Sequence, residues 1–438
     1  MSKVKLIMNK IKNGLFLSKN TERFFFILVC ATLFTSGVCH WLLDLSYKYV
    51  PSQVDTLHID FRIVFWVFVV ISVYYLSREY LFKSSNIQFD FSLLILAQIM
   101  FFIGVLDYQK ERYAGISYTW IIPMAYVIGK LIVRSNEKNY KQRITIVYFS
   151  LAIGLFVVTM LDFYNDYKLI PYYGGFQTGE WLGFWTGQGQ NRCTMEYGLV
   201  MITSAIGFAI YNAKKNKKLF MFELIGCAMA QFYCYKTEGR ENLLLFPLAL
   251  TLFGGVYLYD NWSSCSYKLK KRFLYTVIII FLIIIIGVIG FYTNFFGLYD
   301  KYNSSYLSDD GGIINNIRFT MDWNGFKAML QYPLDDYETV ANITPPHSML
   351  LEYGRVYGLT IYLGLILFRL LIIKEAILLA FSRNVDYSVK YLLVSIFVCF
   401  NLYYSMEPNG FALRYIWMPG LLISGMIKGV NHVAKESI

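Results

Sequence analysis

The chain has 438 residues, of which 56% are apolar, 18% are aromatic and only 16% are charged. Soluble domains carry about 25% charged residues, so a soluble multidomain protein, a disordered chain and a nucleic-acid-binding domain all fit poorly. The formal net charge is +11. The seven cysteines include no Cys-x-x-Cys pair, so neither a disulfide framework nor a zinc site is predicted. The composition predicts a polytopic membrane protein.

Apolar segments long enough to cross a bilayer follow one another along the whole chain. A spanning helix needs about 20 mostly apolar residues. We therefore expect an all-α membrane domain over 1–438 with about 12 spans, of which 61–76 is short and 348–373 begins at a polar edge. The predicted spans are 24–43, 61–76, 89–106, 116–133, 144–162, 195–212, 219–235, 242–259, 273–296, 348–373, 388–405 and 411–427.

The distribution of Lys and Arg predicts the orientation. These residues concentrate in alternate short connections, such as KKNKK at 214–218, and the positive-inside rule assigns those connections to the cytoplasm. The tails 1–23 and 428–438 are then both cytoplasmic. Two long outer loops follow, 163–194 and 297–347, and long connections in compact proteins are commonly functional. We expect any chemistry to face outward.

One of the four histidines, His347, ends the longer outer loop. The sequence from His347 to Thr360 reads HSMLLEYGRVYGLT. On a continuous helix of 3.6 residues per turn, Gly358 lies about three turns below His347 on the same face. A small residue there lets a neighbouring helix approach closely. The plain alternative is a capping or interfacial histidine.

This segment resembles the family of O-antigen ligases and related bacterial polysaccharide polymerases. The family pattern is a His, then Asn, Ser or Gln, nine further residues, a Gly, and shortly afterwards Gly, Thr or Tyr. Here it is filled by His347, Ser348, Gly358 and Thr360.

Two further segments carry the same resemblance. One is Thr-Glu-Gly-Arg at 237–240, which opens a span on the outer side and ends on Arg240, although Gly239 replaces the usual Ser. The other is IRFTMDWNGFKAMLQYP at 317–333, with Arg318 near its start, but without the Gly-x-Gly turn that commonly follows the Pro. Its apolar residues have the spacing of an amphipathic helix lying on a membrane. They are Phe319, Trp323, Phe326 and Leu330.

The resemblance implies a metal-independent, inverting glycosyltransferase of the integral-membrane GT-C type, without a cofactor. Its partners would be an undecaprenyl-diphosphate-linked glycan donor and acceptor within the lipid bilayer, and polymerases of this kind commonly work with a chain-length regulator. Arg240 and Arg318 are then expected to bind the anionic diphosphate and to stabilise the leaving group. His347 is expected to be the general base.

Other polar and aromatic residues have both a functional and a structural interpretation. Arg192 is either a third anion ligand or a rim charge, and Trp181 and Trp185 either stack on sugars or belong to an interfacial aromatic belt. Glu352 and Arg355 favour a structural role over orienting His347. Glu223, inside a span, needs a buried partner. Arg240 and Arg318 also have structural interpretations. Arg240 would then be an interfacial anchor, and Arg318 a solvated helix residue.

Three functions follow from these features. The first is polymerisation of lipid-linked repeat units into O-antigen, capsular polysaccharide or exopolysaccharide at the outer face of a bacterial inner membrane. The second is ligation of such a glycan to lipid A core. The third, from another class, is a flippase or transporter, although the candidate groups lie at the outer rim rather than at the membrane midplane. The motif by itself does not choose between the first two.

Overall fold

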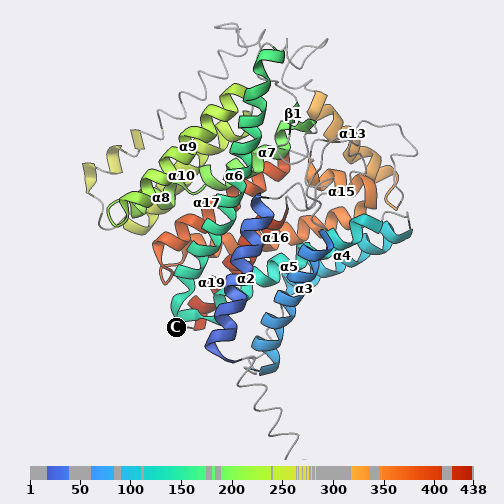
Figure 1. Ribbon diagram of the computed structural model, residues 1–438, viewed down its shortest axis with the longest axis horizontal. Helices are drawn as coiled ribbons and strands as arrows, with labels where there is room; N and C mark the ends of the chain where they lie inside the picture. The colour runs from blue at the N-terminus through green and yellow to red at the C-terminus, as the bar shows by residue number, and fades with distance from the viewer. Residues whose placement is uncertain are drawn as a thin grey trace, which may run out of the picture.

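The computed structural model of the chain consists almost wholly of helices packed side by side (Figure 1). It describes residues 17–38, 61–82, 90–109, 113–173, 180–182, 189–237, 240–262, scattered positions from 264 to 282, 317–334, 346, 348–406 and 417–436. Within these ranges one small sheet occurs, in which β1 (Glu180–Leu182) pairs antiparallel with β2 (Gly189–Asn191). The described residues therefore agree with the predicted all-α class.

Helices occupy the predicted spans, except that 273–296 lies largely outside the described residues. The first half of the chain forms α2 (Lys19–Val38), α3 (Phe61–Leu76) with a π-helical turn η3 (Ser77–Phe82), α4 (Phe91–Gln109), α5 (Tyr113–Ser135), α6 (Tyr140–Tyr173), α7 (Arg192–Thr203) and α8 (Ile206–Asn212). The second half forms α9 (Lys217–Thr237), α10 (Arg240–Asn261), α13 (Ile317–Gln331), α15 (Met349–Tyr357), α16 (Leu359–Phe381), α17 (Tyr387–Met406) and α19 (Trp417–Glu436).

Several helix ends differ from the prediction. Helix α6 runs on to Tyr173, so the first long outer connection begins later than the predicted 163. Helix α19 continues to Glu436, so most of the expected tail 428–438 is helical. The predicted span 195–212 is divided into α7 and α8 at Ser204 and Ala205. Hydropathy locates an apolar run, but hydrogen bonding carries a helix beyond it.

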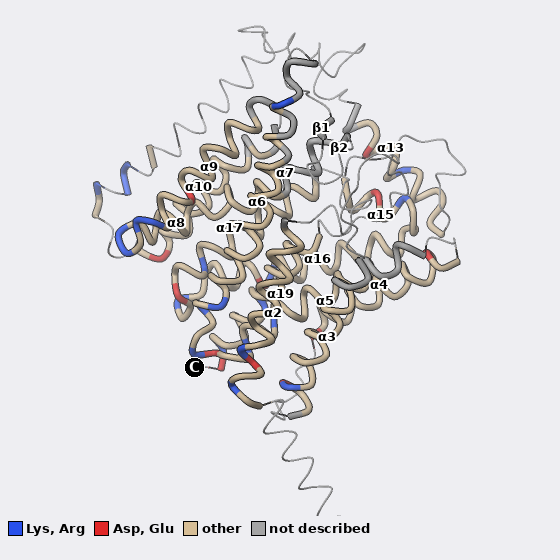
Figure 2. Tube along the Cα trace, viewed as in Figure 1, with Lys and Arg blue, Asp and Glu red and all other residues tan. Residues whose placement is uncertain are grey.

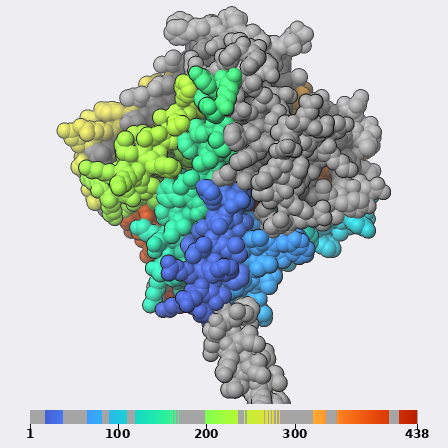
Figure 3. Space-filling model, in the orientation of Figure 1, coloured from blue at the N-terminus to red at the C-terminus, as the bar shows by residue number. Residues whose placement is uncertain are grey.

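Three described helical segments are long and apolar enough to cross a membrane, namely Phe91–Gln109, Glu137–Leu161 and Tyr387–Ser405. Large apolar side chains are also exposed on other helices. Phe24 on α2 and Trp66 on α3 are each 60% exposed, and on the face shown in Figure 3 α2 lies between α6 and α3. Soluble proteins rarely leave so much apolar surface in contact with water. The exposed side chains therefore support contact with lipid.

Helices α5 and α19 pack with their backbones in contact. A Cβ atom added to Gly425 of α19 would lie 2.0 Å from the Tyr126 carbonyl oxygen, and one added to Gly129 of α5 would lie 2.1 Å from that of Leu422. Gly425 and Gly429 form the small-xxx-small pattern that permits such close approach between membrane helices. The glycines thus set the separation of these two helices.

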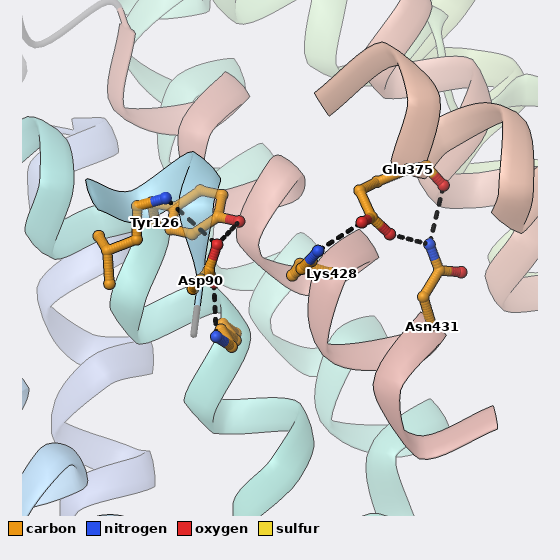
Figure 4. Close-up of polar contacts among 7 residues, drawn as sticks. Asp90, Tyr126, Glu375, Lys428 and Asn431 are labelled. Carbon is orange, nitrogen blue, oxygen red and sulfur yellow. Dashed lines mark hydrogen bonds and ion pairs between the residues drawn. The ribbon is translucent and has the colours of Figure 1, made fainter. Parts of the chain in front are cut away.

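Buried ion pairs join neighbouring helices at one end of the molecule, where many charged residues gather near the marked C-terminus in Figure 2. Figure 4 shows Asp90 bound to Tyr126, and Glu375 between Lys428 and Asn431. Buried charges need partners because desolvation is costly. This is the end that the positive-inside rule assigns to the cytoplasm. The buried pairs are Glu22–Arg143, Glu79–Arg134, Asp90–Lys130 and Asp260–Lys390. Glu375–Lys428 is partly buried, and Asp386–Lys141 is more exposed.

Candidate functional site

Helix α13 forms where the amphipathic pattern predicted a helix within the outer loop 297–347. Its packed face consists of Ala328 and Met329, with Phe326 beside them, and it lies against α15 and the start of α16. Trp323 and Leu330, which belong to the predicted apolar face, are 49% and 52% exposed. The helix therefore packs Ala328 and Met329 against the protein and leaves the large apolar side chains of Trp323 and Leu330 facing outward.

The segment after His347 is not one continuous span. Helix α15 ends at Tyr357, Gly358 has φ +90°, and α16 begins at Leu359. The predicted span 348–373 is thus divided at Gly358, which caps the end of α15. The prediction that His347 and Gly358 share one helix face stays a prediction, because His347 lies outside the described residues. An L-residue rarely adopts this backbone conformation, and the chain uses it to change direction.

The corner at Gly358 is held by the segment that follows α13. The backbone N–H of Leu359 donates to the Pro333 carbonyl oxygen at 2.9 Å. A Cβ atom added to Gly358 would lie 2.7 Å from that same oxygen. The motif glycine does permit close approach, as expected, but its neighbour is a backbone carbonyl rather than a helix.

Helix α15, which precedes the corner, lies back along α16, which follows it (Figure 1). A Cβ atom added to Gly354 of α15 would lie 2.9 Å from the Tyr362 Cβ atom and 2.4 Å from the Met329 sulfur. Met349, the first residue of α15, is 1% exposed and lines the same cavity as Arg369 of α16. The start of α15 is therefore carried into the helical bundle, level with the middle of α16.

Two polar contacts hold α15 in this position. Arg355 donates to both carboxylate oxygens of Glu352, from Nε at 2.8 Å and from Nη2 at 2.5 Å, and both side chains are buried. The Tyr357 hydroxyl donates to Asp107 of α4 at 2.5 Å. The first contact agrees with the structural interpretation of Glu352 and Arg355, and their relation to His347 lies outside the described residues. The sequence analysis did not single out Asp107. The pattern that could have found it is a carboxylate at the end of an apolar span.

Arg240 is the first residue of α10, as the predicted motif required. Asn242, two residues further on, fixes this helix start because it is fully buried, accepts from the Thr203 hydroxyl at 2.7 Å and donates to the Cys234 sulfur at 3.4 Å. Asn242 was not singled out from the sequence. An amide residue two positions after the motif arginine, at the start of an apolar run, is the signal that could have found it.

The outer Gly- and aromatic-rich stretch contains the β1–β2 pairing, in which Trp181 lies opposite Gln190. Arg192 is the first residue of α7, directly after β2. Thr203, which ends α7, is bound to Asn242 near the start of α10. Because a helix rises about 1.5 Å per residue, the start of α7 lies on the order of 16 Å from the contact with α10. The structure therefore does not bring these two helix starts together.

The structure describes the predicted site residues only in part. His347 and Trp185 lie outside the described residues. Arg240, Arg318, Arg192 and Trp181 are placed by their backbone alone. What the structure brings together is the helix that carries Arg318 and the helix that follows His347, whereas α10 contacts this unit through α16 and α17.

Glu223, the carboxylate expected to have a buried partner, is fully buried in α9. The Tyr148 hydroxyl of α6 donates to its Oε1 at 2.8 Å. A hydrogen bond between two helices accounts for this residue without a catalytic role. It stands apart from the α13–α15 unit.

The comparisons with known proteins identify no relative. No protein family model matches the sequence, and no curated protein matches it significantly. The family resemblance consequently depends on the three short motifs alone.

Proposed function

We propose that this protein is a membrane polysaccharide polymerase, which joins undecaprenyl-diphosphate-linked repeat units at the outer face of a bacterial inner membrane. The observation that carries the proposal is the corner at Gly358. The motif glycine has a backbone conformation that other residues adopt only with strain, and it contacts the segment after α13. Two of the three motifs that suggested the family thus form one packed unit.

In the proposed reaction a hydroxyl of the acceptor sugar attacks the anomeric carbon of the donor. The bond from that carbon to the diphosphate oxygen breaks, the configuration inverts, and undecaprenyl diphosphate leaves as an anion. His347 accepts the proton of the attacking hydroxyl. Arg240 and Arg318 bind the diphosphate, because guanidinium groups form paired hydrogen bonds with phosphate oxygens and stay charged.

The remaining predicted residues would recognise the substrate. In the proposed site Arg192 adds a third positive charge toward the diphosphate, and Trp181 and Trp185 stack on sugar rings. The reaction as written needs no metal ion. A chain-length regulator is a proposed protein partner.

The second candidate is an O-antigen ligase, which uses the same motif with lipid A core as acceptor. The two differ in the number of isoprenoid lipids bound at one time, because both polymerase substrates are lipid-linked and only one ligase substrate is an isoprenoid. A flippase is the more distant alternative. It would move the lipid-linked unit without forming a glycosidic bond.

The test uses purified protein in liposomes with a lipid-linked repeat unit as sole substrate, and resolves the glycans by size. Wild type should form a ladder of repeats. His347→Ala should slow its formation by about 10²–10⁴-fold, and Arg240→Ala and Arg318→Ala by about 10²–10³-fold. His432→Ala is the matched control, because it removes a histidine from the last turn of α19.

Each outcome selects one function. A ladder that survives His347→Ala at the wild-type rate refutes the assigned base. Product formed only after lipid A core is added identifies a ligase. If wild type forms no glycosidic bond with either acceptor, the proposed activity is wrong and transport becomes the leading function.

A further inference from the structure

Arg369 is a partly buried cation in the middle of α16. Its Nη2 atom donates to the Asn401 carbonyl oxygen at 2.6 Å and to the Ser405 hydroxyl at 2.5 Å, both on α17. Among the described residues, no carboxylate forms an ion pair with it, in contrast to the paired cations at the other end of the molecule. Cations inside membrane proteins are rare, pair with carboxylates or backbone carbonyls, and commonly mark a functional site.

The α17 contacts place Arg369 at the end of a candidate membrane span. Ser405 is the last residue of the apolar segment Tyr387–Ser405. Trp417, the first residue of α19, lines the same cavity as Arg369. Although Arg369 is central in α16, it is therefore level with the ends of α17 and α19, where lipid phosphate groups lie beside a bilayer.

The cavity around Arg369 has the chemistry of a phosphate site beside an apolar surface. It lies between α15, α16, α17 and α19 and is partly open to the outside. Its walls are apolar except for a few groups, among them Asn401 and Ser424. Because a guanidinium has five N–H donors and both bonds to α17 come from Nη2, the donors on Nε and Nη1 remain for a ligand.

The surface next to this cavity is suited to lipid rather than to water. Leu370, which follows Arg369, is 58% exposed, and Leu402, which follows Asn401, is 38% exposed. A phosphate that carries a long apolar chain can lay that chain against these side chains while its head reaches the guanidinium. Free phosphate would gain nothing from the apolar walls.

We propose that the Arg369 cavity binds the diphosphate of a second polyprenyl lipid, the one that carries the acceptor glycan. This inference rests on the proposed function, in which Arg240 and Arg318 bind the donor diphosphate. A polymerase needs two isoprenoid sites because donor and acceptor are both lipid-linked. Arg369, which has no carboxylate partner among the described residues, supplies the charge for the second one.

The experiment counts lipids bound to the full-length protein by native mass spectrometry, with glycan-free undecaprenyl diphosphate as the probe. Wild type should bind two copies. Arg369→Gln should bind one, with the lost site weakened at least about tenfold, since each charge-assisted hydrogen bond contributes strongly. Arg383→Gln is the matched control, because it removes an exposed cation just after α16 and should leave two copies bound.

Two further variants separate ligand binding from folding. Ser405→Ala removes a hydrogen bond to α17 but keeps the guanidinium, so it should still bind two lipids. Ser424→Leu fills the cavity from α19 without touching Arg369, so it should bind one. If Arg369→Gln does not fold, this second variant still tests the site.

Several results would overturn the assignment. One is two lipids bound to both Arg369→Gln and Ser424→Leu. Others are equal occupancy of this site by undecaprenol, by inorganic pyrophosphate or by phosphatidylglycerol, which would show that the diphosphate, the isoprenoid chain or both are not recognised. One lipid on wild type and none on Arg369→Gln would keep the Arg369 site but overturn the donor site. A failure of the second lipid site can therefore be told apart from a failure of the proposed polymerase activity, because the first is measured by the lipid count and the second by the glycan ladder.

Discussion

Gly358 shows how one residue determines the course of the chain at the candidate site. Its φ of +90° and its contact with the Pro333 carbonyl exclude a side chain for two separate reasons. The sequence predicted that a small residue matters at this position, because the family motif contains it. The neighbour that it predicted, another helix, was wrong, because a pattern of residues does not reveal that a helix stops and turns back against a backbone carbonyl.

Replacing Gly358 by Ala should destabilise the protein by about 1–3 kcal/mol, because the added Cβ forces a strained backbone conformation against a backbone oxygen. Thermal unfolding of the detergent-purified protein measures this. Gly104→Ala in α4 is the control, since a Cβ atom there meets nothing within 4 Å and Ala favours the helix. Equal melting temperatures for Gly358→Ala and wild type would contradict the prediction.

Helix α17 illustrates how an element is tied at its start and its end. At its start, Asp386 Oδ1 accepts from the backbone N–H of Ser388 at 2.9 Å, and Oδ2 accepts from Lys141 at 2.8 Å. Near its end, the Asn401 carbonyl oxygen accepts a hydrogen bond from the Arg369 guanidinium. Partial burial acts to raise the pKa of Asp386, but the hydrogen bonds from Lys141 and Ser388 outweigh it and hold the pKa below its usual value.

Because the pKa of Asp386 is depressed in the folded state, its stabilising effect is present above the unfolded value of about 4 and is lost as the pH falls through the folded value. Asn keeps the hydrogen bond to the start of α17, so Asp386→Asn should lower the free energy of unfolding near neutral pH by only about 0.3–1 kcal/mol, through the lost charge. The difference from wild type should shrink in acid. Unfolding followed from pH 7 to pH 3 measures this.

The control for this pH series is Glu137→Gln, which removes an exposed carboxylate from the short connection between α5 and α6. It should unfold like wild type across the series. An Asp386→Asn deficit that stays constant down to pH 3 would show that the carboxylate charge is not the cause.

The molecule as a whole is polarised along its helices. The buried ion pairs between helices and the C-terminal end of α19 lie at one end, while α13, α15 and the β1–β2 pairing gather at the other (Figures 1 and 2). This separation agrees with the orientation that the positive-inside rule predicts.

Labelling with a membrane-impermeant maleimide tests this orientation in intact bacterial cells, in a background whose native cysteines are replaced by Ala. Leu334→Cys, at a position that is 85% exposed after α13, should react from outside. Arg383→Cys, between α16 and α17, should react only after permeabilisation. The reverse pattern would invert the topology and exclude chemistry at the outer face.

The sequence by itself determined the apolar helices, the helix at α13 and the residues of the three motifs, because hydropathy and periodicity act over neighbouring residues. Tertiary structure alone decided the rest. The turn at Gly358 depends on a carbonyl from Pro333, and the tie between α4 and α15 joins Asp107 to Tyr357. The hydrogen bonds of Arg369 depend on α17 lying beside α16. Such contacts join residues far apart in the chain, so no local pattern contains them.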